Sequence, residues 1–245
     1  MIVGKAWGAA LVALVLVAAS ARAADQPGAT QQALVKAFEE RVFVALPGST
    51  QKLVLKWQVP VSFGVVSREG ISPRYYNDTF ARIEEMQEAS GKDFLVSSSH
   101  INFLVLFSTD TEADVKAFGA EIAPFFADGV DYHGFFEDYQ RHGLGCAGKM
   151  LLSPEHAIIG YLLFVSVSED RSLDAVDACV ARDLLRGMGV IAAPAPGKAE
   201  AAPRRAGNFT QLDRQILQVL YNSALKSGEP ASEAAKAILK IPVAN

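Results

Sequence analysis

The sequence predicts a single α+β domain in which helices pack on a small mixed β-sheet. Several stretches repeat apolar residues at intervals of three and four, which is the spacing of one face of a helix. Between them lie shorter runs of β-branched and aromatic residues that fit strands. The chain has 245 residues, half of them apolar, so it is long enough to bury a substantial core.

The first 23 residues have the pattern of a signal peptide. Lys5 supplies a positive start, an apolar run covers residues 9–19, and Ala21-Arg22-Ala23 gives a small-x-small cleavage pattern. The run is short for a membrane span, and no cysteine stands at the cleavage point to carry a lipid. We expect an exported protein, periplasmic or secreted and not a lipoprotein. A signal peptide (1–23) and a polar leader (24–32) would precede one domain (33–245) without a transmembrane segment.

Helices are expected where apolar spacing and capping residues coincide. The expected helices are 33–46, 73–90, one from Asp110 or Thr111 to Pro124, 172–190, one capped by Thr210, and 232–239. In the helix 73–90, the inward-facing residues would be Tyr76, Phe80, Ile83 and Gln87. Strands are expected at 53–66, interrupted at Pro60, near 94–96, at 101–107, and at 157–167, the best candidate for a central strand. Residues 128–148 lack periodicity and indicate a loop region, and the Ala/Pro-rich stretch 192–206 indicates a flexible insert.

Cys146 and Cys179 are the two cysteines of the chain. An even pair in an exported protein favours a disulfide over two free thiols. The bridge would close a loop of roughly 34 residues, for which the chain-entropy relation gives about 3.5 to 4 kcal/mol. The alternative, Cys179 as a nucleophile, would need a basic partner such as His142 or His156 brought close by the fold.

The stretch from Cys179 to Val190 has the outline of a zinc-protease helix without its ligands. Such a helix carries His-Glu-x-x-His followed by Leu-Gly-Leu, so that two imidazoles on one face meet one zinc ion. Laid on Met188-Gly189-Val190, the pattern places Arg182 and Arg186 at the ligand positions and Asp183 at the general base. Because arginine stays protonated and cannot be a ligand, we expect no metal and no cofactor. These three side chains would then line what remains of the cleft.

Two further segments carry the same resemblance. An insert follows the helix, and Phe209-Thr-Gln-Leu-Asp-Arg-Gln-Ile-Leu-Gln-Val-Leu-Tyr221 closes the pattern. Together with Trp57-x-x-Pro60-Val61, these residues resemble the proteobacterial exported family catalogued as domain of unknown function 2927, over roughly 33–228. The closing segment is also similar to the end of metzincin-type zinc proteases. The resemblance therefore implies a zincin-like fold, and it implies no activity.

Three other signals favour simpler interpretations. Gly143 to Gly148 match G-x-G-x-x-G by letter, but the strand and helix of a dinucleotide site are missing around them. The four histidines lack the short spacing of a zinc module and would have to converge in three dimensions. The loop 131–139 interleaves aromatic residues with acids, which suits a binding surface but also a loop anchored on the core. Its candidate contact residues are Tyr132, His133, Phe135, Phe136 and Tyr139.

The net charge of −4 and the lack of a basic block give no reason to expect nucleic acid. The leading hypothesis is a non-catalytic binding or envelope-associated module whose partner is an unidentified protein or envelope component. One alternative is a hydrolase of peptide or cell-envelope material, acting through Asp183 or a histidine cluster. The other is a structural or assembly protein of the envelope. A buried network of Arg182, Asp183 and Arg186 would favour this structural role, because charges that satisfy each other are scaffolding.

Overall fold

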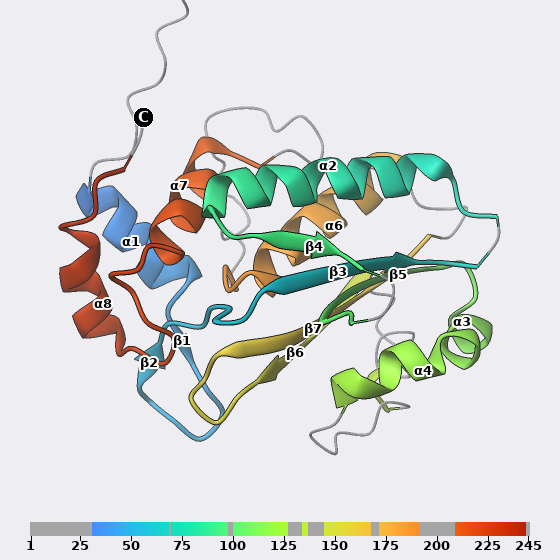
Figure 1. The fold of residues 1–245 in the computed structure, drawn as a ribbon, viewed down its shortest axis with the longest axis horizontal. Helices are drawn as coiled ribbons and strands as arrows, with labels where there is room; N and C mark the ends of the chain where they lie inside the picture. Colours follow the sequence, from blue (N-terminus) through green and yellow to red (C-terminus); the bar gives the residue numbers. More distant parts are fainter. Residues whose placement is uncertain are drawn as a thin grey trace, which may run out of the picture.

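The computed structural model of the chain describes residues 31–68, 70–97, 100–126, 134–136, 145–167, 172–191 and 209–243. Its centre is a five-stranded mixed sheet in the order β4-β3-β5-β7-β6 (Figure 1). Four parallel strands form most of it: β3 (Val61–Val66), β4 (Phe94–Val96), β5 (Phe103–Ser108) and β7 (Ile158–Ser166). The fifth, β6 (Cys146–Leu152), runs antiparallel to β7 at one edge. The predicted α+β class with a small mixed sheet is confirmed.

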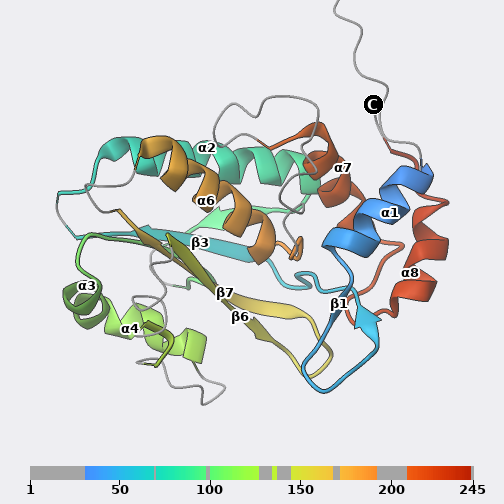
Figure 2. The same cartoon turned by 180° about the vertical axis from the view of Figure 1, so that it is seen from behind.

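Helices cover both faces of the sheet (Figures 1 and 2). The long helices α2 (Pro73–Ser90) and α6 (Leu173–Gly187) lie on one face. The short helices α3 (Thr111–Ala117), α4 (Gly119–Ile122) and the 3-10 turn η1 (Ala123–Phe126) lie on the other. The side chains of β5 point alternately to the two faces of the sheet. Phe103, Val105 and Phe107 belong to one buried cluster, and Leu104 and Leu106 belong to the cluster on the other face.

A third group of elements closes one end of the sheet (Figure 2). It consists of α1 (Gln31–Arg41), the two-residue strands β1 (Val44–Ala45) and β2 (Lys52–Leu53), α7 (Gln211–Leu220) and α8 (Ala231–Ile238). Helix α7 begins as predicted at Thr210, whose side chain and that of Asp213 form a capping box. Within the described part of the chain, no helix is both long and apolar enough to cross a membrane.

The structure differs from the predicted elements in several places. The single helix expected up to Pro124 is divided into α3, α4 and η1, with Phe118 between the two helices. Helix α1 ends at Arg41 instead of residue 46, because Val44–Ala45 pairs with Lys52–Leu53. The expected strand 53–66 is divided into β2, an isolated bridge at Trp57 and β3. Helix α2 buries Thr79 and Arg82, while Gln87, expected inside, is exposed. The expected loop 128–148 ends early, because β6 begins at Cys146.

Candidate functional site

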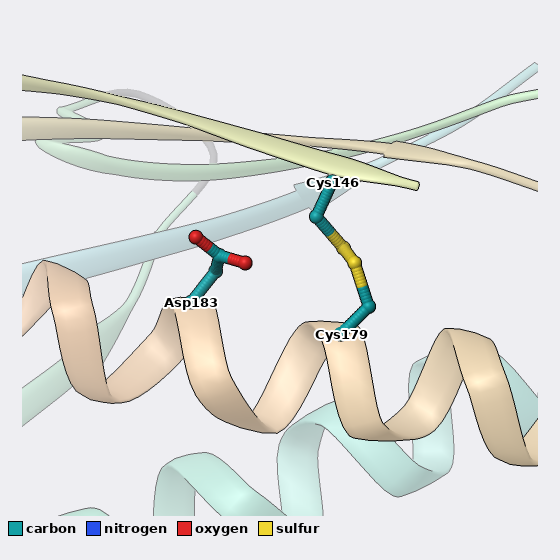
Figure 3. Close-up of side chains that lie close together, drawn as sticks. All are labelled: Cys146, Cys179 and Asp183. Carbon is teal, nitrogen blue, oxygen red and sulfur yellow. A yellow bond between two sulfur atoms is a disulfide. The ribbon is translucent and has the colours of Figure 1, made fainter. Parts of the chain in front are cut away.

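Helix α6 begins at the predicted N-cap Ser172 and ends at Gly187 instead of residue 190. Its N-cap Ser172 accepts a hydrogen bond from the Ala175 amide, and Asp174 stands in the first turn, where an acid suits the helix dipole. One face packs on β6 and β7, and another face packs on α2. This packing places Asp183 on the side of α6 that faces the sheet (Figure 3).

The turn after α6 brings together the three segments that carry the sequence resemblance. The Trp57 indole donates a hydrogen bond to the Gly187 carbonyl at 2.8 Å, and the Tyr221 hydroxyl donates to the Met188 carbonyl at 3.0 Å. Gly189 follows with a φ of +93°, in the region that favours glycine. Segments 57, 187–190 and 221 therefore form one buried junction that fixes the end of α6.

Asp183 is fully buried between α6 and the sheet. The Arg182 guanidinium donates to its Oδ2 through Nη2 at 2.6 Å and Nε at 3.1 Å. Arg186 Nη1 lies 3.6 Å from Oδ1, beyond a normal hydrogen bond. The side chains of Arg182 and Arg186 remain 50% and 47% exposed. Of the three predicted site residues, Asp183 is therefore a buried carboxylate, whereas the side chains of Arg182 and Arg186 are partly exposed to solvent.

The predicted cysteine pair lies beside this carboxylate (Figure 3). Cys146 at the start of β6 and Cys179 on α6 are at disulfide-bonding distance, with Cα atoms 5.9 Å apart. Their sulfur atoms and a carboxylate oxygen of Asp183 all lie within 4.8 Å of one another. Arg182 Nη2 is 3.6 Å from the Cys179 sulfur, so the same guanidinium touches both the carboxylate and the bridge.

Tyr161 on β7 is the site residue that the sequence did not indicate. Its side chain is buried, and two glycines leave room for it: a Cβ on Gly148 would overlap its hydroxyl, and one on Gly187 would overlap its ring. Burial, and next the charge of Asp183, raise the pKa of Tyr161 well above its ordinary value. A neutral phenol therefore lies near the Asp183 carboxylate. In the sequence, the only sign of this buried tyrosine is Gly148, which lies on the strand next to the one that carries Tyr161.

Strand β6 pairs with β7 on one side and is the last strand of the sheet within the described part of the chain. Cys146, Met150 and Leu152 belong to the hydrophobic cluster on the α6 side, and Ala147 and Leu151 belong to the cluster on the opposite side. After the buried Cys146, every residue of the strand is half-buried. Among the described residues, no strand pairs with the other side of β6, and Cys146 at its start lies against Cys179, whose sulfur is 3.6 Å from Arg182 Nη2.

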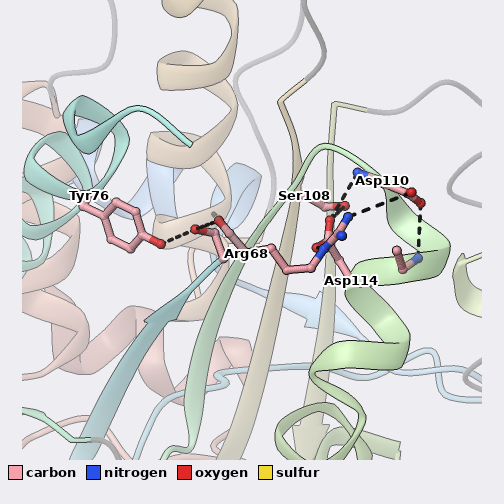
Figure 4. A network of polar contacts seen from close by, with 7 residues as sticks. Arg68, Tyr76, Ser108, Asp110 and Asp114 are labelled. Carbon is pink, nitrogen blue, oxygen red and sulfur yellow. Dashed lines mark hydrogen bonds and ion pairs between the residues drawn. The ribbon is translucent and has the colours of Figure 1, made fainter. Parts of the chain in front are cut away.

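A second polar cluster lies where β3 and β5 end (Figure 4). Arg68 pairs with the buried Asp114 and lies 3.9 Å from Asp110. Asp114 Oδ2 also accepts hydrogen bonds from the Ser108 hydroxyl at 2.6 Å and from the Asp110 amide at 3.2 Å. These contacts tie α3 to the sheet, and they leave the carboxylate satisfied. We assign this cluster a structural role.

Of the predicted loop residues, the two that the structure describes, Phe135 and Phe136, belong to the hydrophobic cluster on the face of the sheet opposite α6. Phe136 is buried against Phe164, with ring centroids 4.9 Å apart, and Phe135 packs on Phe136 at 5.0 Å. Both thus serve as anchors on the core. Tyr132, His133, Tyr139 and His142, together with residues 1–30 and 192–206, lie outside the described residues. Over the described ranges, the one group of three converging metal-ligand side chains is Cys146, Cys179 and Asp183.

Comparison with protein-family models, with curated proteins and with solved structures finds no match for this chain.

Proposed function

We propose that this protein is an exported, non-catalytic binding module of zincin-like fold that holds an extended, carboxylate-bearing peptide segment beside α6. The zincin-like assignment is supported by the order of the parts: a buried strand, a helix with a glycine turn, and a closing helix that opens with Thr-x-x-Asp and ends at Leu220-Tyr221. It is also supported by the contacts of Trp57 and Tyr221 with the glycine turn.

The observation that carries the proposal is the way Asp183 holds the two arginines. A buried carboxylate accepts two hydrogen bonds from the Arg182 guanidinium and lies 3.6 Å from Nη1 of Arg186, while about half of each side chain stays in contact with solvent. The three charges sum to one net positive charge, so an anion is attracted. Planar guanidinium groups match carboxylates in two-point hydrogen bonds, and a prearranged pair loses less entropy on binding.

Strand β6 supplies the second half of the site. A strand with an open edge can add an extended peptide through backbone hydrogen bonds, while side-chain pockets and charges set specificity. Because β6 lies beside α6, a peptide added there would run past Arg182 and Arg186. A carboxylate on that peptide would meet the guanidinium groups.

The same geometry argues against hydrolysis through Asp183. A general base must come within hydrogen-bond reach of the water that it activates. Asp183 is buried, and one of its oxygens is already engaged by Arg182. The buried acid by itself also suits the structural alternative, in which the arginines only neutralise it. Exposure of the arginine ends favours binding, and the following experiment separates the two.

The test is fluorescence anisotropy with a labelled octapeptide of alternating valine and glutamate, and with a valine–lysine octapeptide as the charge-reversed control. We expect the acidic peptide to bind the wild-type protein, and the double variant Arg182→Gln/Arg186→Gln to bind it at least about tenfold more weakly. Arg214→Gln is the matched control, since Arg214 on α7 is similarly exposed and pairs with Glu85. Equal affinity of wild type and double variant, or no binding by the wild type, would leave the structural role as the better account.

A further inference from the structure

Two sulfur atoms and one carboxylate converge at a buried point between β6 and α6 (Figure 3). Each of Cys146, Cys179 and Asp183 offers one ligand atom, and these atoms lie within 4.8 Å of one another. Cys146 and Cys179 are 6% and 7% exposed, so both residues are largely but not completely buried from solvent. Sulfur and carboxylate ligands hold zinc at about 2.3 and 2.0 to 2.2 Å, so the three donor atoms can share one ion once the bond between the sulfur atoms is broken and these atoms move apart.

The carboxylate has an oxygen available for such an ion. Asp183 Oδ2 accepts from Arg182, whereas Oδ1 is buried without a hydrogen bond of normal geometry among the described residues, and the equally unpaired Tyr161 hydroxyl lies near the carboxylate. Buried acceptors in proteins are nearly always satisfied, so an unsatisfied one marks a place where a donor or a cation is expected. In Figure 3 the carboxylate leaves α6 toward the sheet, on the same side as the two sulfur atoms.

The three side chains can bind a metal ion only when the disulfide between Cys146 and Cys179 is reduced. While the sulfur atoms are bonded to each other they are poor ligands, and the free thiolate is the form that binds metals. Arg182 lies 3.6 Å from the Cys179 sulfur, and a neighbouring guanidinium favours the thiolate of a reduced cysteine. Two thiolates and one carboxylate outweigh the two arginines by one negative charge, which suits a divalent cation.

We propose that the reduced protein binds one thiophilic divalent cation, Zn²⁺ foremost, through the sulfur atoms of Cys146 and Cys179 and the carboxylate of Asp183. The disulfide takes two electrons and two protons from a dithiol, which becomes a disulfide in turn. Each cysteine then releases its proton as its sulfur binds the ion, and a water molecule completes the tetrahedron. Thiolates select zinc, cadmium and cobalt over calcium or magnesium. The site is structural, and it goes beyond the peptide-binding function without depending on it.

Cobalt titration tests the site directly. The full mature chain is reduced anaerobically with a phosphine, and Co²⁺ is added while the visible spectrum is recorded. We expect the intense bands of tetrahedral, thiolate-bound cobalt at one equivalent, lost when Zn²⁺ is added. The oxidised protein should give none of these bands, and it serves as a control of identical sequence. Cys146→Ser/Cys179→Ser is the second control, because it lacks both the disulfide and the thiolates.

Asp183→Asn keeps the shape of the side chain and removes its charge. It should weaken cobalt binding by at least the roughly tenfold that loss of an outer-shell partner costs. Circular dichroism accompanies each titration. If reduction unfolds the chain, Zn²⁺ should restore the native spectrum, because a cation that binds only the folded state stabilises it. A reduced protein without thiolate–cobalt bands, or one that Zn²⁺ fails to refold, would overturn the proposal.

Discussion

Gly189 has a backbone conformation and a neighbour that both exclude a side chain. Its φ is +93°, and a Cβ there would overlap the backbone carbonyl oxygen of Leu55, which cannot rotate away. Gly91 at the end of α2 is the matched control, since its φ is +63° but a Cβ would meet nothing within 4 Å. We expect Gly189→Ala to lower the free energy of unfolding by about 3 kcal/mol and Gly91→Ala by about 1 kcal/mol.

Urea denaturation of both variants checks this difference, because a shift of the midpoint at constant m-value reports stability. Equal losses would mean that the junction of Leu55 and Gly189 relaxes around the added methyl group. Residue-scale features of this kind are only partly visible in the sequence. The turn at Met188-Gly189-Val190 was predicted from its pattern. Its partner Leu55 could not be predicted, because no local signal links two residues so far apart.

Buried charges illustrate the same limit. Asp183 was predicted at the site, but its burial and the exposure of its arginine neighbours depend on how α6 lies on the sheet. Asp213 was predicted only as part of a motif, and it pairs with the buried Arg41, 172 residues away. Tyr161 stands in a run of strand-forming residues, and nothing in that run indicates that it lies near Asp183. A charged or aromatic side chain shows its type in the sequence, whereas its partner is set by the fold.

At the scale of elements, Lys56 holds the C-terminus of α7 to the segment that precedes β3. Its ammonium donates to the carbonyl oxygens of Leu220 at 3.1 Å, Asn222 at 3.1 Å and Leu225 at 2.7 Å. Burial, and next the nearby charge of Lys92, lower the pKa of Lys56 to about 8. The folded protein therefore loses this proton more readily than the unfolded chain, whose lysine keeps its ordinary pKa near 10.5.

This difference predicts a pH dependence of known sign. Between about pH 8 and 10.5 the unfolded chain binds more protons, so the contribution of Lys56 to stability rises with pH in that window. We expect the stability of the wild type relative to Lys56→Met to increase from about pH 7 to 9.5, below the range where ordinary tyrosines titrate. Urea midpoints of both proteins at several pH values measure it. A constant difference would show that Lys56 titrates at its ordinary pKa.

Elements with strong periodicity and capping residues were predicted well, and short paired elements were not. Helices α2, α6 and α7 have clear stop or cap signals at Gly91, Ser172 and Thr210. Strand β6 was not predicted at all, because its glycine and its half-buried residues hide the alternation of a strand. Helix α1 was predicted too long because the apolar residues after Arg41 fit a helix equally well. In both cases pairing with the next strand along the chain decided the structure, since β1 pairs with β2 and β6 pairs with β7.

At the scale of the whole molecule, the cysteine bridge connects the edge strand to the helix that covers the sheet. Cys146 and Cys179 are 33 positions apart, and β7 lies between them in the chain. A cross-link acts mainly by restricting the unfolded chain, and for a loop of this length the loss on reduction is about 3.5 to 4 kcal/mol. A domain typically has about 5 to 15 kcal/mol in total, so the reduced protein should remain folded.

Chemical denaturation of the oxidised protein, the reduced protein and Cys146→Ser/Cys179→Ser, all without metal, tests this last prediction. Reduced protein and double variant should lose similar amounts, because both lack the cross-link and neither changes the packing of more than one sulfur atom per site. The m-value should increase slightly in both, since an unfolded chain without the bridge exposes more surface. A much smaller loss would indicate that contacts of α6 with β6 and β7 already restrict the unfolded loop. A much larger loss would mean that the bridge supports native packing, and that the proposed metal site of the reduced protein forms only when a cation replaces the bond shown in Figure 3.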